Sequence, residues 1–359
     1  GYGHVNHPGL DFYKRVIDYC LECGIRPWVT IYHWDLPLAL ENQGGWTNRS
    51  IVNWFREYVL TLAMHLGDRV NDWVVLNEPM AFTGAGYFLG LHAPGRYGMR
   101  NFLPAVHHAA LCQAEGGRIL RSELQGSNIG TSFSMSQVEP LTQQPADILA
   151  ANRVHTLLNR LFLEPSLGLG YPIKDLPFLS KIESFMKPGD DKRLAFDFDF
   201  IGVQNYTREM VSANWFTPYL RAKLIPAKLR NVPTTAMDWE VYPPALYQVL
   251  KWVSAYKQVK QIIVTENGAA FHEPQPFNGE ADHHRIEFLK QNIYQLRKAM
   301  AETDKIKGYF VWSFLDNFEW AEGYNPRFGL VHVDFKTQIR TIKHSGYWYR
   351  KFIMEQQLV

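Results

Sequence analysis

Cysteine is scarce in this chain, which has three in 359 residues. Cys20 and Cys23 form a C-x-x-C pair, but the pair lies in residues 11–24, whose apolar spacing and final glycine are typical of an amphipathic helix. No second cysteine pair completes a zinc set, and three cysteines cannot form a disulfide framework. We therefore expect no metal site, no redox role and a reducing, cytoplasmic location.

The chain also lacks a large excess of positive or negative charge. The formal net charge is +2, so neither nucleic acid nor an anionic membrane surface is expected as a partner. No apolar run approaches the length of a membrane span, and no signal peptide is visible. Because the sequence begins at Gly1 and not at methionine, we leave its true N-terminus open.

Aromatic residues, in contrast, are plentiful at 14%, with 11 tryptophans. Their commonest role is to fill a large core. They can also form platforms for sugar rings, because the C–H faces of a sugar pack on aromatic faces. We expect core or packing roles for five residues: Trp28, Trp73, Trp252, His107 and His108.

Apolar runs alternate with amphipathic stretches along the whole chain. This alternation predicts six βα units around a parallel sheet, in one α/β domain that covers residues 1–359. The expected strands are residues 28–33, 73–78, 128–135, 199–206, 262–266 and 308–314. The expected helices are residues 10–23, 50–66, 103–121, 147–161, 244–256, 282–302 and 343–354. Two segments rich in glycine, or in proline and tryptophan, are predicted as loops: 79–100 and 207–243.

Two of the expected strands end in a glutamate. The run IIVTENG reaches Glu266, and Gly268 is expected to let the chain turn. The run WVVLNEP reaches Glu78, after which a proline blocks further pairing. Taken alone, each is ordinarily interpreted as a solvated glutamate at a strand end. On two strands of one parallel barrel, both carboxylates would face the same mouth, and two facing carboxylates are the minimal machinery for cutting a glycosidic bond.

Four stretches resemble motifs of glycoside hydrolase family 1, the β-glucosidase family, and occur in the family's order. They are residues 32–37 (YHWDLP), 76–79 (LNEP), 264–268 (VTENG) and 312–320 (WSFLDNFEW). The resemblance extends from the first residue to the C-terminus. It implies a (β/α)8 TIM barrel and a retaining β-glycosidase that needs no cofactor, since two carboxylates suffice.

The resemblance also implies a role for each carboxylate. Glu78 is expected to be the general acid/base and Glu266 the nucleophile. Retention requires carboxyl groups about 5–5.5 Å apart. Carboxylates this close push their proton affinities apart, so one holds a proton while the other stays charged.

Seven further residues match the family's sugar-binding positions. By resemblance, Tyr206 holds the nucleophile, Trp312 is the floor on which the ring stacks, and Glu319 with Trp320 reads the O4 and O6 hydroxyls. Asn77 suits a hydrogen bond to the 2-hydroxyl. An anion at Glu319 would repel a phosphate at O6, so unphosphorylated sugars are expected. The seven are His33, Trp34, Asn77, Tyr206, Trp312, Glu319 and Trp320.

The chain departs from the family in two places. Gln204 stands where the family usually has asparagine, which is expected to shift a hydrogen bond near the nucleophile. The family's first two strands and first helix are absent, together with an arginine beside the nucleophile and a glutamine that binds outer hydroxyls. We therefore expect a barrel truncated at its N-terminus, with open edges at the strands ending in His33 and Phe314. A missing N-terminal fragment or a homo-oligomer would cover them, and Glu266 would hold its proton more readily.

Two functions are kept as alternatives. The first is an exo-acting, retaining β-glycosidase for β-glucosides, with β-galactosides and β-fucosides not distinguished. The second is a sugar- or small-molecule-binding protein on a truncated barrel, with weakened catalysis. The presence of Glu78, Glu266 and Glu319 favours the enzyme, whereas the missing arginine and glutamine favour the binding protein. The aglycone is expected to meet the loops after Pro79 and around residues 215–229.

Overall fold

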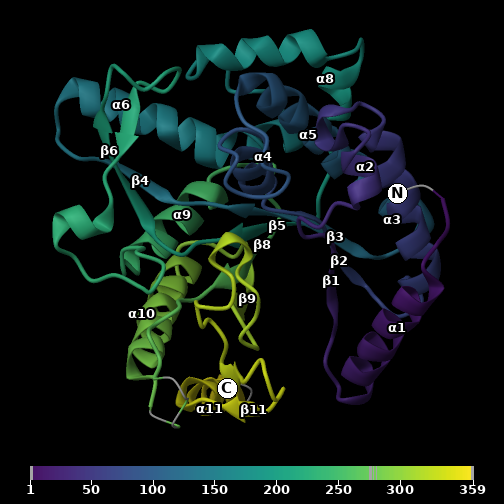
Figure 1. Cartoon of the computed structure of the whole chain (residues 1–359), viewed down its shortest axis with the longest axis vertical. Coiled ribbons are helices and arrows are strands. Elements are labelled where there is room, and N and C mark those ends of the chain that lie inside the picture. Colours follow the sequence, from purple (N-terminus) through teal and green to yellow (C-terminus); the bar gives the residue numbers. More distant parts are fainter. Residues whose placement is uncertain (1–2, 275–276, 278, 280, 357–359) are drawn as a thin grey trace. The chain divides into compact units, whose positions relative to one another are not determined.

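A computed structural model describes residues 3–274, 277, 279 and 281–356 (Figure 1). The chain divides into two compact units, each assembled from three stretches. The first unit consists of Gly1–Ser134, Thr156–Gly202 and Tyr256–Ile262. The second unit consists of Met135–His155, Val203–Ala255 and Ile263–Val359. That the whole chain is one domain stays a prediction.

All six predicted strands are present. They are hydrogen-bonded in their order along the chain, β1-β2-β3-β5-β8-β9, so β1 and β9 are the edge strands, as expected. β2 pairs in parallel with both β1 and β3. β2 and β5 are buried along their whole length, which explains their continuous apolar runs. The strands are β1 Trp28–Tyr32, β2 Asp72–Asn77, β3 Asn128–Ser134, β5 Phe200–Gln204, β8 Ile262–Asn267 and β9 Ile306–Val311.

In the first unit, helix α5 packs against α3 and against β2 and β3. Apolar residues of α3 recur three or four positions apart, so Phe55, Val59 and Leu62 are buried on one face. Gly116 lets α5 come close to the sheet, because a Cβ there would lie 2.6 Å from the Val75 side chain. The helices of this unit are α1 His7–Glu22, α2 Leu38–Glu41, α3 Ile51–Leu66, α4 Pro79–Tyr87, α5 Met99–Glu123, α7 Leu163–Ser166 and α8 Asp190–Arg193. The unit also contains two 3-10 helices, η1 Gly45–Thr47 and η3 Pro177–Phe185, and a π-helical segment, η2 Thr156–Arg160.

The predicted loop 79–100 is wrong in its first half, which forms α4. Pro79 occupies the first helical position, where its missing N–H is harmless. Gly86 lies inside the helix because the returning chain passes close to it. A Cβ on Gly86 would lie 2.6 Å from the Ala93 carbonyl oxygen. Gly86, one of the glycines that indicated a loop, therefore serves packing, whereas Gly90, Gly95 and Gly98 have positive φ angles and lie in the loop that follows α4.

The predicted loop 207–243 is also wrong, since it contains two strands of a second sheet. β6 pairs in parallel with β4 and antiparallel with β7. Only Val211 of β6 is buried, so the strand lacks the apolar alternation by which a strand is recognised in a sequence. The strands of this sheet are β4 Gln137–Pro140, β6 Arg208–Ala213 and β7 Ala222–Leu224.

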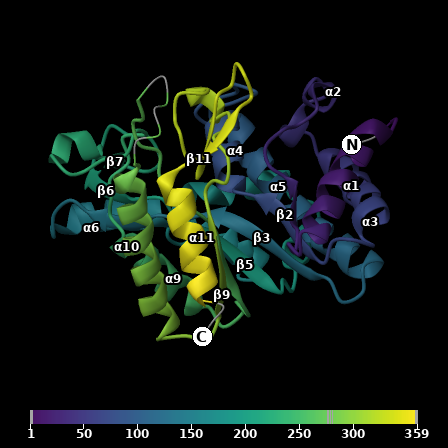
Figure 2. The same ribbon diagram turned by 90° about the horizontal axis from the view of Figure 1, so that it is seen from below.

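Three helices of the second unit pack on one another. α10 packs against α9 and α11 (Figure 2), and Ala269, Phe288, Leu289 and Leu330 form a buried cluster that includes part of α10. The helices are α6 Pro145–His155, α9 Pro244–Ser254, α10 His283–Met300 and α11 His344–Gln356. The remaining elements are β10 Val331–Val333, β11 Arg340–Ile342, η4 Ala227–Arg230 and η5 Trp320–Glu322.

The expected packing roles are largely confirmed. Trp73, His107 and His108 are buried, and burial lowers the pKa of His108 to about 4. Trp28 and Trp252 are half-buried against the rings of neighbouring side chains.

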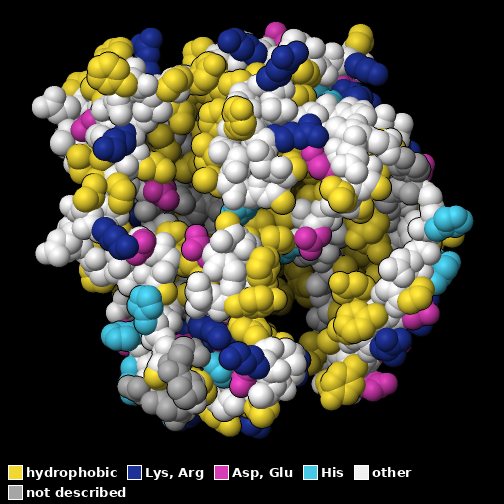
Figure 3. All heavy atoms as spheres, viewed as in Figure 1, with side chains coloured by type: hydrophobic (Ala, Val, Ile, Leu, Met, Phe, Trp, Pro, Cys, Tyr) yellow, Lys and Arg dark blue, Asp and Glu magenta, His cyan; other side chains and the backbone are white. Residues whose placement is uncertain are grey.

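The surface of α1 is unusually apolar. Phe12, Tyr13 and Tyr19 are each more than half exposed, and apolar side chains lie among charged ones where α1 runs in Figure 3. That a homo-oligomer or a missing N-terminal fragment covers the sheet edges at β1 and β9 stays a prediction. Within the described residues, every helix is too short or too polar to cross a bilayer.

Candidate active site

The first unit gathers four predicted residues at the ends of β1 and β2. Trp34 Nε1–H donates a 3.0 Å hydrogen bond to the Asn77 carbonyl oxygen. The Asn77 Nδ2 atom lies 3.2 Å from His33 Nε2. Ser132 of β3 donates from Oγ to Asn77 Oδ1 at 3.0 Å. The Asn77 amide is thus fixed at both its oxygen and its nitrogen, next to Glu78.

These contacts determine which nitrogen of His33 carries its proton. Burial lowers the pKa of His33 to about 4, so the ring is neutral at neutral pH. Since Ser132 bonds the Asn77 oxygen, the Asn77 nitrogen faces His33 and donates to it. Nε2 of His33 is then the acceptor, and Nδ1 bears the hydrogen.

Glu78 is positioned by its backbone. Its N–H donates to the Ser132 carbonyl oxygen at 2.9 Å, and its φ angle is 46°, in the left-handed region. That region costs a residue with a Cβ about 1–2 kcal/mol, and such strain clusters at functional sites. The side chain lies at the carboxyl end of β2, where only 7% of the residue is exposed. Pro79 then starts α4.

In the second unit, both carboxylate oxygens of Glu266 accept hydrogen bonds. Gln204 Nε2 donates to Oε1 at 2.7 Å, and the Tyr206 hydroxyl donates to Oε2 at 2.5 Å. Both donors are neutral, and hydrogen bonds to a carboxylate favour its charged form. They act against the proton retention expected from the missing arginine. Gln204, the departure from the family pattern, thus contacts Glu266, the predicted nucleophile, directly.

The neighbours of Glu266 are themselves held in place. The Tyr206 ring packs against Trp239, with centroids 5.3 Å apart. Asn267, the last residue of β8, is fully buried. Its Nδ2 donates to the Asn205 carbonyl oxygen at 2.7 Å, and its Oδ1 accepts from the Tyr309 hydroxyl at 2.6 Å. The end of β8 is therefore cross-linked to the ends of β5 and β9.

Gly268 is required by a close approach and not by a turn, which corrects the expectation from the sequence. Its φ angle is not positive. A Cβ on Gly268 would lie 1.7 Å from the Trp312 carbonyl oxygen. The Trp312 N–H also donates to the Asn267 carbonyl oxygen at 3.0 Å. The segment that carries Trp312 therefore packs directly on the residues that follow Glu266.

Glu319 is a buried carboxylate at the far end of that segment. Burial raises its pKa to about 7, and a hydrogen bond from Trp312 only partly opposes this shift. Its Oε2 atom is buried and has no hydrogen-bond partner among the described residues. A buried acceptor without a partner is costly, so this oxygen can gain a bond from a ligand hydroxyl. Trp320 follows, with a φ angle of 45°.

The predicted site residues thus fall into two groups. The first unit brings together His33, Trp34, Asn77 and Glu78. The second unit holds Tyr206, Glu266, Trp312, Glu319 and Trp320. The separation of the two glutamates stays a prediction. Sequence reasoning missed the supporting residues Ser132, Asn205 and Tyr309, whose only signal is a polar group beside or within an apolar run.

Comparison with known proteins decides the family. The model described as "Glycosyl hydrolase family 1" matches residues 1–358. The chain belongs to glycosyl hydrolase family 1. The resemblance drawn from the four motifs is confirmed, and the α/β fold is of the (β/α)8 barrel class.

Members of family 1 with established names are similar over nearly the whole chain. Beta-glucosidase A of Thermotoga maritima is 42% identical over 360 residues, which are 100% of this chain and 80% of the relative. Beta-glucosidase A of Acetivibrio thermocellus is 38% identical over 358 residues, or 98% of this chain and 79% of the relative. The structure of the T. maritima beta-glucosidase in complex with deoxynojirimycin has a TM-score of 0.93 at 41% identity, and the match covers 98% and 79% of the two chains.

One group of side chains in this family 1 protein offers ligands for a metal ion. Among the described residues, Glu273, Asp316 and His332 place donor atoms within 4.8 Å of one another. Cations of the protein already bind these carboxylates. Lys343 Nζ lies 2.5 Å from Glu273 and 3.0 Å from Asp316, and Arg285 lies 2.9 Å from Glu273. A divalent ion would meet these positive charges, so we interpret the group as a buried ion network.

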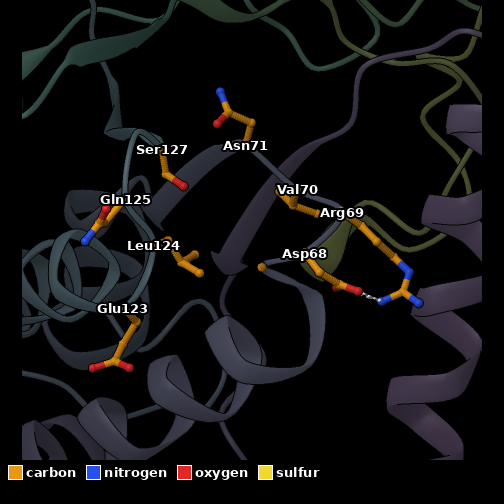
Figure 4. A pocket seen from close by; sticks show the side chains of 9 residues that line it. Asp68, Arg69, Val70, Asn71, Glu123, Leu124, Gln125 and Ser127 are labelled. Atoms are coloured by element: carbon orange, nitrogen blue, oxygen red, sulfur yellow. Dashed lines mark hydrogen bonds and ion pairs between the residues drawn. The ribbon is translucent and has the colours of Figure 1, made fainter.

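A pocket of about 390 Å³ lies elsewhere in the first unit (Figure 4). Its lining includes Val70 and Asn71, which precede β2, whereas Glu78 follows β2. Active sites of (β/α)8 barrels lie at the carboxyl ends of the strands. This pocket is therefore at the opposite strand end from the candidate catalytic residue, and we assign it no role in catalysis. It is lined by residues 67–71, 123–125 and 127.

Proposed function

We propose that this family 1 protein is a retaining exo-β-glycosidase that hydrolyses β-glucosides through a covalent glycosyl-enzyme intermediate. The main support is the Glu266 carboxylate, which Gln204 and Tyr206 hold by hydrogen bonds to both oxygens. Relatives that are 38–42% identical over nearly the whole chain carry the name beta-glucosidase. A protein that only binds sugars would not need a buried carboxylate with hydrogen bonds to both of its oxygens at this position.

In the first step, Glu266 acts as the nucleophile. One of its oxygens bonds to the anomeric carbon while the bond to the leaving oxygen breaks. Glu78 donates its proton to that oxygen, and the alcohol departs. The products are a glucosyl ester on Glu266 and an ionised Glu78, so one negative charge is present before and after the step.

In the second step, Glu78 acts as the base. It takes a proton from water while the water oxygen bonds to the anomeric carbon and the ester bond breaks. β-Glucose leaves, Glu266 is ionised again, and Glu78 is protonated. The anomeric carbon is inverted twice, so its configuration is retained. The ester carries no charge on Glu266, which makes the deprotonation of Glu78 easier.

The remaining residues bind the sugar in this proposal. Asn77, fixed in orientation by Ser132, bonds the 2-hydroxyl, and His33 and Trp34 lie beside it. Trp312 forms the platform for the ring, while Glu319 and Trp320 read O4 and O6. Because a carboxylate at Glu319 repels an anion, the substrates are unphosphorylated. β-Galactosides and β-fucosides stay alternatives to β-glucosides. A homo-oligomer and a cytoplasmic location also stay predictions.

Binding of the glucoside is expected to weaken on acidification, because Glu319 titrates near neutrality. Its pKa is raised to about 7, so the side chain takes up a proton as the pH falls through that value. The protonated form accepts fewer hydrogen bonds from hydroxyls, and the KM of p-nitrophenyl β-glucoside should rise by up to about tenfold per pH unit below it. His33, with a pKa near 4, stays neutral in this range. Glu319→Gln should abolish the dependence, whereas a wild-type KM that is flat from about pH 5.5 to 8 would contradict the assignment.

Trapping the intermediate tests the proposed function. In 2,4-dinitrophenyl 2-deoxy-2-fluoro-β-glucoside the fluorine slows both steps, and the good leaving group restores only the first. The protein should gain the mass of one fluoroglucosyl group, located by peptide mapping on Glu266, and lose activity in parallel. A binding protein would hold the reagent without forming an adduct. An adduct on another side chain would contradict the role of Glu266.

A further inference from the structure

Lys343 bonds to two segments of the second unit at once, the segment that follows β8 and the segment that follows β9. Its side chain is fully buried and immediately precedes α11. Nζ donates to Glu273 Oε1 at 2.5 Å and to Asp316 Oδ1 at 3.0 Å. Glu273 follows β8, which carries Glu266, whereas Asp316 lies in the middle of residues 312–320. One ammonium group thus bridges both segments.

Asp316 is the anchor of residues 312–320. Its side chain is completely buried. Oδ1 also accepts from the Gly329 N–H at 2.9 Å. Oδ2 accepts from the Val333 N–H at 3.3 Å and from Arg327 at 3.4 Å. The position of this carboxylate therefore sets the backbone between Trp312 and Glu319.

The network around Lys343 is balanced in charge, so the loss of one cation has a specific effect. Without Lys343, the carboxylates of Glu273 and Asp316 keep Arg285 and Arg327 but lose the ammonium group that bonds to both. His332 Nδ1 also lies 3.7 Å from Glu273 and 3.4 Å from Asp316, but burial lowers the pKa of His332, so its ring is neutral at neutral pH. Two buried anions that share no cation repel each other strongly at low dielectric. The repulsion would push the segment after β9 away from the segment after β8. The three anions and three cations are Glu273, Asp282, Asp316, Arg285, Arg327 and Lys343.

We propose that Lys343 is a positioning residue for sugar recognition, which acts by holding residues 312–320 against the end of β8. It does not touch the substrate. It works through Asp316 on Trp312 and Glu319, which the proposed function assigns to the sugar ring and its outer hydroxyls. The inference therefore rests on the proposed function, and it adds a buried determinant of specificity outside the site itself.

A comparison of two substrates isolates this effect. An aryl β-xyloside lacks the hydroxymethyl group that carries O6. Displacement of Glu319 should therefore weaken the binding of this xyloside less than it weakens the binding of an aryl β-glucoside. Lys343→Met is expected to raise the glucoside KM by about tenfold or more, since a hydrogen bond to a charged group is worth that factor. The ratio of kcat/KM for the glucoside to kcat/KM for the xyloside should fall in this variant in proportion to the rise in the glucoside KM. A purely structural role would lower activity on both substrates equally.

Arg160→Met is the control for the loss of a cation that two carboxylates share, although Arg160 is 23% exposed and Lys343 is fully buried. Arg160 lies 2.7 Å from both Glu164 and Asp175 in the first unit, so its loss also deprives two carboxylates of a shared cation. The control should lower the unfolding midpoint without changing the glucoside-to-xyloside ratio. Where Lys343→Met does not fold, Asp316→Asn keeps the shape of its side chain, weakens the same contact and should shift the ratio in the same direction. An unchanged ratio in every folded variant overturns the inference.

A double mutant ties the effect to Glu319. If Lys343 acts through Glu319, the free-energy losses calculated from kcat/KM for the glucoside in Lys343→Met and Glu319→Gln are not additive. The kcat/KM of the combined variant is then only slightly below that of Glu319→Gln alone. Additive losses contradict the inference. The wild type is assayed first. If the wild-type protein hydrolyses neither substrate, the result contradicts the proposed function. In that case calorimetric binding of deoxynojirimycin replaces KM and tests Lys343 separately, and affinity equal in wild type and Lys343→Met overturns the inference.

Discussion

Glu266→Ala is expected to lower kcat by about 10⁴–10⁶-fold, the range found when a catalytic nucleophile is removed. Without the carboxylate no glycosyl ester can form, and Gln204 and Tyr206 lose the acceptor that they now share. Steady-state hydrolysis of p-nitrophenyl β-glucoside measures the loss. The cavity left by the side chain also permits rescue. Azide should enter it, attack the anomeric carbon in a single inversion and give the α-glucosyl azide.

Glu164→Ala is the control for Glu266→Ala. Glu164 and Glu266 are both 8% exposed, so each substitution removes an equally buried carboxylate. Glu164 binds Arg160 and Tyr256 in the first unit, and its loss should lower the unfolding midpoint while kcat stays within a few-fold of wild type. A Glu266→Ala variant that folds and keeps more than about one hundredth of the wild-type kcat would refute the nucleophile assignment. A β-glucosyl azide product would refute it as well.

Local sequence patterns were sufficient to predict the strands of the central sheet. Continuous apolar runs mark β2 and β8 because both strands are buried, and the glutamate that ends each run breaks the pattern at a recognisable place. The same reasoning failed for α4 and β6. Gly86 serves the approach of Ala93 and does not mark a loop. β6 exposes most of its residues partly and so has no clear period.

The candidate site was predictable where a motif carries it and not where distant contacts build it. Gln204 could be recognised as unusual, but its bond to Glu266 spans 62 residues and has no signal in the sequence. Lys343 is an ordinary lysine in the sequence. Only the fold buries it between Asp316, 27 residues away, and Glu273, 70 residues away. A charge at such a position is recognised only once its surroundings are known.

Glu78→Gln is expected to lower activity by an amount that depends on the leaving group. For substrates with alkyl or sugar leaving groups, whose oxygen needs a proton to depart, kcat/KM should fall by about 10²–10⁴-fold, the usual contribution of general acid catalysis. For 2,4-dinitrophenyl β-glucoside, whose leaving group departs without a proton, kcat/KM should fall by less than about tenfold. The amide of glutamine keeps the size of the side chain, so Asn77 and His33 are not disturbed.

The same variant separates the two roles of Glu78. Glutamine cannot act as a base, so the second step is slow even where the first step is fast. Rapid mixing with 2,4-dinitrophenyl β-glucoside should show a burst of dinitrophenolate equal to the enzyme, followed by a slow steady state with a low KM. Azide should accelerate the slow phase and give the β-glucosyl azide, because it attacks the ester without a base and completes the second inversion. A residue that only positions the sugar would affect every substrate alike. An equal loss of kcat/KM for all leaving groups would therefore show that Glu78 is not the acid/base, and so would the absence of a burst.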